Sequence, residues 1–312
     1  MLGGIDGSNH SSMVAVLHRS DPEEVVMPTS MHEMSLAAGN VALRVSALSD
    51  VGTTRKLNED SHRSIAPVFL VADGMGGHAH GDWASQRVVE TIAARIPEGR
   101  PTSASAVLEA ITEANSTVRQ IPSDYTDDST MAGTTVSGIA LVESEKRDSL
   151  HWMIFNVGDS RVYSWDGGLN LLTVDHSAVQ ELIDRGDITE AEAAVHSERN
   201  VITRAIGVDR EVEPDVWLLP AGGQQTFLIC TDGLTKGVSD EQLSAVFTKC
   251  IEENATDLLV SALVSAAIES GGLDNITVVV VESSIVKEGE TAAGVSSQDS
   301  LPAFLEETRP RL

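Results

Sequence analysis

From residue 41 onward the chain alternates between short apolar runs and segments with helical spacing. Residues 41–47 alternate apolar and polar positions and residues 68–72 form a continuous apolar run, and both patterns predict strands. Apolar residues at helical spacing predict helices over 81–96 and 103–120. By the same criteria, strands are predicted over 134–142, 151–157, 161–165, 169–173, 213–219, 225–231 and 275–282, and helices over 176–186, 189–196, from 239 and over 256–270.

The order of these elements predicts one folded domain with a segment on either side. Paired strands before and after paired helices favour two sheets covered by helices, which is one α+β domain over about 41–285. Residues 1–40 have weak periodicity and are interpreted as an N-terminal extension. The polar residues 286–312 are interpreted as a flexible C-terminal tail.

Composition excludes some classes of function. The 312 residues include 47 Asp and Glu against 21 Lys and Arg, a formal net charge of -26. Such a charge argues against sequence-independent nucleic-acid binding, which needs cations to neutralise phosphates. No apolar run approaches the roughly 20 residues of a membrane helix, and the start of the chain lacks the pattern of a secretory signal. Cys230 and Cys250 favour two free thiols in a reducing cytosol, with a disulfide left open. We therefore expect a cytoplasmic protein without nucleic-acid or membrane partners.

Four short acidic segments lie beside predicted buried strands. They are Asn58-Glu59-Asp60, Asp73-Gly74, Thr231-Asp232-Gly233 and Leu273-Asp274-Asn275, with Arg55 just before the first. Carboxylates at strand ends, next to glycines that let the backbone come close, are suited to hard divalent cations. Each segment alone is typical of an ordinary turn, a cap or a surface charge. Four of them in this order favour a metal site.

The full set of motifs resembles the metal-dependent serine/threonine protein phosphatases (the PPM or type 2C family) in their bacterial form. The resemblance covers about Val41 to Glu282. Besides the acidic segments and Arg55 it rests on Ser49-Asp50-Val51-Gly52, Gly76-Gly77-His78, Gly133-Thr134-Thr135, Asn156-Val157-Gly158-Asp159-Ser160-Arg161, Asp175-His176-Ser177, Thr203-Arg204-Ala205-Ile206-Gly207 and Asn275-Ile276-Thr277.

This resemblance implies a fold and an activity. The fold is an α-β-β-α sandwich, with two central antiparallel sheets flanked by helix pairs. The activity is hydrolysis of phosphoserine and phosphothreonine in proteins by a water that two Mg²⁺ or Mn²⁺ ions activate. The implied partners are phosphorylated proteins and a bacterial serine/threonine kinase whose action the protein opposes.

The resemblance also implies roles for the metal ligands. Asp73 bridges both metals, Gly74 offers its carbonyl oxygen to one of them, and Asp232 and Asp274 complete the second metal's carboxylates. Glu59 acts through a water ligand.

Two further residues of the first acidic motif have implied roles. Asp60 holds the water molecules around the metals. Arg55 is the catalytic residue that binds the substrate phosphate with a bidentate fork.

The sequence departs from the family pattern at two places. Asp159 matches a ligand of a third metal, but Lys236 stands where the family usually has another aspartate. The lysine would repel a third ion or pair with Asp159, and both outcomes stay open. Met75 stands where animal members carry a histidine, and the general acid is not assigned to His62, His78 or His80.

Residues 176–207 match the flap that borders the active site in this family. Ser177 and Arg204 are the candidate substrate contacts there, and two short surface helices with a connector are an equally compatible interpretation.

Two other functions are weighed. Stress-response phosphatases that act on anti-sigma-factor antagonists share the Asp-Gly and Asp-Asn signatures but usually lack the counterparts of Arg55 and Asn58-Glu59-Asp60. A catalytically impaired phosphatase fold that serves as a binding module is favoured by Lys236 alone.

Overall fold

Two antiparallel sheets form the centre of the protein in the computed structural model, which describes residues 29–36, 39–76, 80–120, 132–143 and 149–286. The first sheet has, in spatial order, β1 (Thr29–Leu36), β2 (Gly39–Asp50), β12 (Ile276–Val286), β11 (Gly223–Cys230), β8 (Arg161–Trp165) and β9 (Leu169–Leu171). The second has β10 (Asp215–Pro220), β7 (Leu150–Val157), β6 (Val136–Glu143), β4 (Val68–Met75) and β3 (Asp60–Ile65), with the short β5 (Gly133–Thr134) paired to β4.

The apolar run of β4 shows how the second sheet is buried on both faces. Phe69 and Val71 pack into the core between the two sheets, together with Trp152 of β7 and residues of β2, β11 and β12. Val68 and Leu70 alternate with them and pack against the helices on the other face. Successive strand residues point to opposite faces, so a continuous apolar run is what a strand covered on both sides requires.

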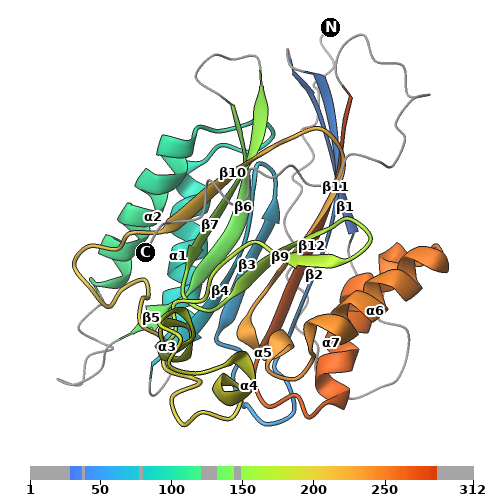
Figure 1. Ribbon diagram of the computed structural model, residues 1–312. Helices are drawn as coiled ribbons and strands as arrows, with labels where there is room; N and C mark the ends of the chain where they lie inside the picture. The colour runs from blue at the N-terminus through green and yellow to red at the C-terminus, as the bar shows by residue number, and fades with distance from the viewer. Residues whose placement is uncertain (1–28, 37–38, 77–79, 121–131, 144–148, 287–312) are drawn as a thin grey trace, which may run out of the picture.

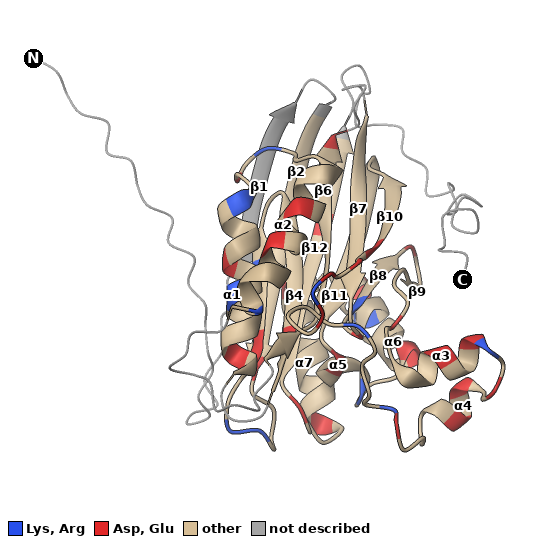
Figure 2. Ribbon diagram, turned by 90° about the vertical axis from the view of Figure 1, so that its left-hand side faces the viewer, with Lys and Arg blue, Asp and Glu red and all other residues tan. Residues whose placement is uncertain are grey.

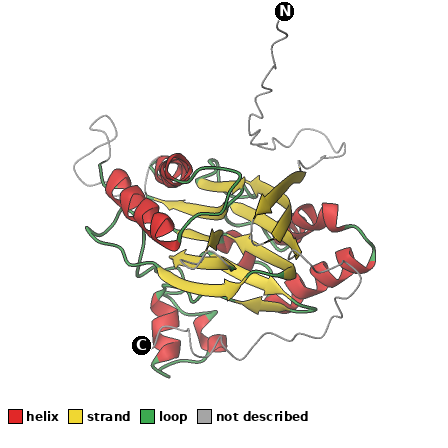
Figure 3. Ribbon diagram, turned by 90° about the horizontal axis from the view of Figure 1, so that it is seen from above, coloured by secondary structure: helices red, strands yellow, loops and turns green. Residues whose placement is uncertain are grey.

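Each sheet carries a pair of helices on its outer face. Helices α1 (Gly81–Arg95) and α2 (Ala104–Val118) share an apolar core with β4, β6 and β7. Helices α6 (Asp240–Glu252) and α7 (Leu259–Glu269) cover the first sheet. Figure 3 shows the strands in two layers between these helices, and Figure 1 shows the same arrangement from the side. The predicted α-β-β-α sandwich, an α+β fold, is confirmed.

Local sequence signals fix where α6 begins. The Ser239 hydroxyl accepts a hydrogen bond from the Gln242 N–H, and the Gln242 side chain accepts one from the Ser239 N–H. This reciprocal capping box satisfies two backbone donors that a helix start would otherwise leave unpaired. The helix predicted from residue 239 therefore begins with Ser239 as its N-cap.

Three elements were not predicted from the sequence. Strand β1 pairs with β2 ahead of residue 41, so the first sheet starts upstream of the expected boundary of the extension. Strand β3 is mostly polar, with the sequence DSHRSI, and it exists because its backbone pairs with β4. The four-residue helix α5 (Asp232–Thr235) is too short to give a periodic signal.

The ends of the chain lie partly outside the described residues. Strand β12 continues to Val286, past the end predicted at 282, and residues 1–28 and 287–312 are not described. Both cysteines are buried and free, as the first interpretation expected. Within the described ranges, none of the helices combines the length and the apolar character that crossing a membrane requires.

Candidate active site

The four acidic segments meet at one end of the sandwich, where α5 lies between the ends of the two sheets (Figure 1). Asp60 opens β3 and lies directly opposite Asp73 near the end of β4. These two residues belong to the second sheet. Asp232 follows β11 and Asp274 precedes β12, and β11 and β12 are neighbouring strands of the first sheet. The Thr231 hydroxyl donates a 2.8 Å hydrogen bond to Oδ2 of Asp60, which ties the two sheets together at this end.

Asn275 holds the loop that carries Arg55. Its Nδ2 donates to the carbonyl oxygens of Val51 at 3.0 Å and Leu57 at 2.9 Å. Its Oδ1 accepts from the Glu59 N–H at 2.9 Å. From the sequence, Asn275 was recognised only as part of a motif, with no role of its own. Its position next to Asp274 was the signal that could have indicated a role at the site. The side chain fixes the first and last acidic segments relative to each other.

The backbone around Gly74 is packed too closely for any side chain. A Cβ atom on Gly74 would overlap the carbonyl oxygen of Gly81, at the start of α1. The Gly74 N–H donates to the Glu59 carbonyl at 3.1 Å. A Cβ on Gly81 would in turn lie 2.6 Å from Oε1 of Glu59. These glycines bring the Glu59 side chain to the turn after Asp73, whereas the carbonyl-ligand role of Gly74 stays a prediction.

Five carboxyl groups interact at this end: Asp60, Asp73, Asp159, Asp232 and Asp274, which we call the carboxylate cluster. Burial raises the pKa of Asp60 to about 7, and the charges of Asp232 and Asp274 add to the rise. Burial followed by the charge of Asp232 also raises the pKa of Asp159 to about 7. For Asp73, burial and then the other carboxylates raise the pKa well above its usual range. Buried carboxylates that repel one another retain protons unless a cation compensates them.

Three carboxylate oxygens of the cluster are buried and accept no hydrogen bond from the described residues. They are Oδ1 of Asp60, Oδ1 of Asp159 and Oδ1 of Asp232. Buried polar atoms are normally paired, so three unpaired oxygens within one cluster call for a ligand. Carboxylate oxygens are the donors that Mg²⁺ and Mn²⁺ prefer. The donor set therefore fits divalent cations.

Two cationic side chains reach into the cluster. Lys236 Nζ lies 2.5 Å from Oδ2 of Asp232 and 3.0 Å from Oδ2 of Asp274. Arg55 lies 2.9 Å from Oδ1 of Asp274 and 4.0 Å from Oε2 of Glu59. Among the described residues, no three His, Cys, Asp or Glu side chains are arranged as a ready-made ligand set.

Of the two outcomes left open for Lys236, the ion pair with Asp159 does not form among the described residues. The ammonium group pairs with Asp232 and Asp274 instead. It still acts on Asp159 through its charge, which lowers the pKa of Asp159 against the larger effect of burial. Asp159 is therefore a buried carboxyl of the cluster, and its third-metal role stays a prediction.

The raised pKa of Asp159 gives a prediction for the metal-free protein. A carboxyl with a pKa raised to about 7 in the fold destabilises the fold increasingly as pH rises from about 4 to about 7. Asp159→Asn should therefore stabilise the metal-free protein by about 2–4 kcal/mol at pH 8 and change it little near pH 4. Urea unfolding in EDTA at both pH values measures this. A difference of the same size at both values would contradict it.

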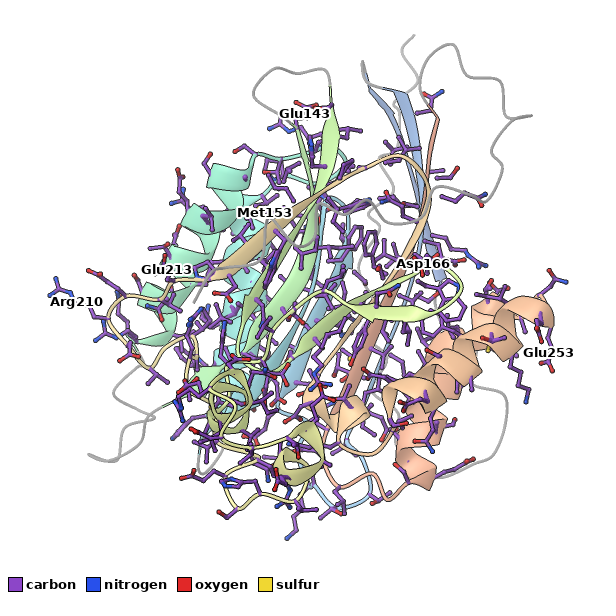
Figure 4. The ribbon with its side chains drawn as sticks, in the orientation of Figure 1. Glu143, Met153, Asp166, Arg210, Glu213 and Glu253 are labelled. Carbon is purple, nitrogen blue, oxygen red and sulfur yellow. The ribbon has the colours of Figure 1, made fainter. Side chains whose placement is uncertain are left out.

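The two candidate substrate contacts of the flap lie in other networks. Ser177 is buried and caps α3 (Ala178–Asp184), accepting from the Gln180 N–H at 3.3 Å. Arg204 donates to Asp215 at 2.6 Å and to the Glu213 carbonyl at 2.9 Å. Figure 4 shows Glu213 in the segment that leads into β10. Neither side chain has an ion pair or hydrogen bond with the carboxylate cluster among the described residues.

Two short helices do form in the flap, as the pattern predicted. They are α3 and α4 (Glu190–Ala193), and acidic residues recur on both (Figure 2). His176 joins this region to the sandwich, because its Nε2 lies 3.2 Å from Asp215 and its Nδ1 accepts from the Gly158 N–H at 3.0 Å. Ser177 and Arg204 thus have structural partners in this region, and their role as substrate contacts stays a prediction.

The general acid is not identified by the histidines near the site. His78 lies outside the described residues. Burial lowers the pKa of His62 to about 4, so its ring is neutral near pH 7 and is not the imidazolium form that acts as a general acid. His80 is buried at the start of α1.

Comparison with known proteins gives consistent matches. A family model described as "Protein phosphatase 2C" matches residues 54–265. The "Serine/threonine protein phosphatase PstP" of Mycobacterium tuberculosis is 36% identical over 270 residues, which are 85% of this chain and 50% of PstP, so the chain spans about half the length of that relative. The "Serine/threonine phosphatase stp" of Listeria monocytogenes is 33% identical over 260 residues, 78% of this chain and 98% of that protein.

A solved structure is also similar. It is that of the catalytic domain of the serine/threonine protein phosphatase PstP in complex with two manganese ions. It has a TM-score of 0.66 and 34% identity, and the match covers 78% of this chain and 99% of that one.

Proposed function

The chain belongs to the protein phosphatase 2C family, and from this premise we propose that it is a metal-dependent protein serine/threonine phosphatase. The observation that carries the proposal is the carboxylate cluster. Five carboxyl groups from distant segments share one end of the sandwich, and three of their oxygens are buried and unpaired. A fold stabilised for its own sake would not collect such groups, because each buried unpaired carboxylate destabilises it.

Two Mg²⁺ or Mn²⁺ ions are the cofactors that this donor set fits. Support comes from the hard oxygen donors, and from the PstP catalytic domain, which carries two manganese ions. In the proposal, Asp73, the Gly74 carbonyl oxygen, Asp232 and Asp274 would hold the two ions, and Glu59 and Asp60 would orient the water molecules around them. When bound, such ions supply the positive charge that polarises phosphoryl oxygens and makes water a nucleophile.

Arg55 is proposed to bind the substrate phosphate. Its side chain is 47% exposed and lies at the rim of the carboxylate cluster, with its guanidinium directed at Asp274. A guanidinium can donate two parallel hydrogen bonds to a phosphate, and its charge offsets that of the dianion. Arg55 thereby holds the phosphate beside the carboxylates and leaves the peptide part of the substrate in solvent.

Phosphorylated proteins are the proposed substrates, and a serine/threonine kinase that modifies the same proteins is the proposed opposing partner. Relatives of this chain are named serine/threonine phosphatases, which supports a phosphoprotein substrate. We also propose a reducing compartment such as the cytoplasm, because both cysteines are free and buried.

Phosphopeptide hydrolysis with and without metal tests the proposed function. Purified protein with Mn²⁺ should release phosphate from phosphoserine and phosphothreonine peptides, and excess EDTA should remove that activity completely. Adding Mn²⁺ back in excess over EDTA should restore it. Equal turnover in EDTA would refute a metal-dependent mechanism.

The position of Lys236 favours a second candidate, a phosphatase fold that binds phosphoproteins without hydrolysing them. Its ammonium group forms ion pairs with Asp232 and Asp274, two of the carboxylates that the metals need. This candidate predicts that the protein binds fewer than two Mn²⁺ ions even at millimolar metal. Two ions per chain by equilibrium dialysis would exclude it.

A further inference from the structure

Lys236 is placed by backbone that the fold holds firmly. It caps α5, and its N–H donates to the Asp232 carbonyl at 2.7 Å. Helix α5 lies against the start of β12, where a Cβ atom on Gly233 would overlap the Asn275 carbonyl oxygen. The Cα of Lys236 is therefore fixed beside the carboxylate cluster.

The Lys236 side chain is less constrained than its backbone. It is 37% exposed, so part of it borders solvent. A lysine carries its charge on four methylene groups, and several rotamers can carry Nζ away from its present contacts. The ammonium group can therefore leave the cluster without unfolding α5.

In its present position the ammonium group joins two carboxylates from different segments. It bridges Oδ2 of Asp232 and Oδ2 of Asp274, and the side chains of these two residues are 12% and 17% exposed. Arg55 contacts the other oxygen of Asp274, so both oxygens of that carboxylate face cations. Among the described residues, Lys236 and Arg55 are the cations that form ion pairs with the carboxylate cluster.

The bridge offsets the repulsion within the cluster. The ammonium group lies 2.5 Å from Oδ2 of Asp232 and 3.0 Å from Oδ2 of Asp274, so each carboxylate has an attractive partner beside its like-charged neighbours. In the absence of metal, the ammonium group thus supplies positive charge where carboxylates from both sheets meet.

We propose that Lys236 is an internal counter-ion that competes with divalent metal ions for Asp232 and Asp274. This inference rests on the proposed function, because it assumes that these aspartates bind metal. A divalent ion shared by Asp232 and Asp274 takes the oxygens that the ammonium group now contacts. Binding of that ion therefore requires Nζ to move out, and the cost of breaking the bridge lowers the affinity for metal.

Metal titration of Lys236→Met tests the competition. Methionine keeps most of the length and apolar volume of the side chain and removes the charge. Isothermal titration calorimetry should give at least one Mn²⁺ site whose affinity is about tenfold higher in the variant than in the parent, equivalent to about 1.4 kcal/mol. Lys236→Arg, which keeps a positive charge, should retain the parent's weaker affinity.

Thermal unfolding supplies a readout that does not depend on turnover. In EDTA, Lys236→Met should unfold at a lower temperature than the parent, because the carboxylates lose their counter-ion. Saturating Mn²⁺ should remove this difference, so that metal raises the Tm of the variant by more than it raises that of the parent.

Lys249→Met is the matched control. Lys249 is an exposed lysine in the last turn of α6. Neither the metal affinity nor the metal-dependent Tm of this variant should differ from the parent's. If Lys236→Met and the parent bind two Mn²⁺ ions with equal affinity, the competition is refuted and the proposed function stands. If neither protein binds Mn²⁺, the two-metal site and the competition both fail.

Discussion

Asp73→Asn is expected to lower the turnover of phosphopeptides at least about a thousandfold, equivalent to about 4 kcal/mol of transition-state stabilisation. Asp73 interacts with every other carboxylate of the cluster. In the proposed function it would help to hold both metals. Asparagine keeps the shape of the side chain and removes its charge. The bound metals would then lose the carboxylate that holds them together.

The same variant should be more stable than the parent without metal. Burial and its neighbours raise the pKa of Asp73 far above its usual range, so ionising it destabilises the metal-free fold above pH 4. Urea unfolding in EDTA at pH 8 should therefore give a larger free energy of unfolding for Asp73→Asn than for the parent. Steady-state assays in Mn²⁺ should show the loss of turnover. Asp166→Asn, at the exposed turn between β8 and β9 (Figure 4), is the control and should change neither quantity. Near-normal turnover in Asp73→Asn would remove Asp73 from the metal site.

Arg55→Lys is expected to lower kcat/KM for phosphopeptides about a hundredfold. A hydrogen bond to a charged group contributes about 1.5–3 kcal/mol, and lysine cannot reproduce the two parallel bonds of a guanidinium. Because Arg55 is proposed to hold the phosphate, the loss should be large for phosphorylated substrates and should raise KM. The fold should be unaffected, since the side chain is 47% exposed.

Arg87→Lys is the matched control for Arg55. Arg87 lies on α1 with its side chain 41% exposed and pairs with Glu90 at 2.9 Å. Its kinetic parameters should equal the parent's, because its ion pair is with Glu90 on the same helix. A kcat/KM for Arg55→Lys within threefold of the parent's would contradict the phosphate-binding role.

The elements that the sequence predicted well are those with a local signal. The helical spacing over 81–96 and the apolar run at 68–72 correspond to α1 and β4, within a few residues at each end. An element that is buried on one face or on both needs apolar residues at a regular spacing, and this spacing can be recognised in the sequence. The N-cap at Ser239 is just as local, since it satisfies donors only three residues away.

The elements that the sequence missed depend on partners elsewhere. Strand β3 is polar and forms because it pairs with β4, and β1 precedes the predicted boundary because β2 holds it. Ser177 and Arg204 were singled out by motif alone. In the fold, Ser177 caps a helix and Arg204 pairs with Asp215, while their role as substrate contacts stays a prediction.

The acidic segments show both what the sequence determines and what only the tertiary structure decides. Their resemblance to the motifs of a known family predicted the fold, and carboxylates at strand ends beside glycines predicted a metal site. The sequence also identified Lys236 as the departure from the family pattern, but not its partner. Asp274, 38 residues away, faces its ammonium group only because α5 and the start of β12 are packed together. Charge pairing depends on distance in space, so the choice between Asp159 and the Asp232–Asp274 pair was made by the tertiary structure alone.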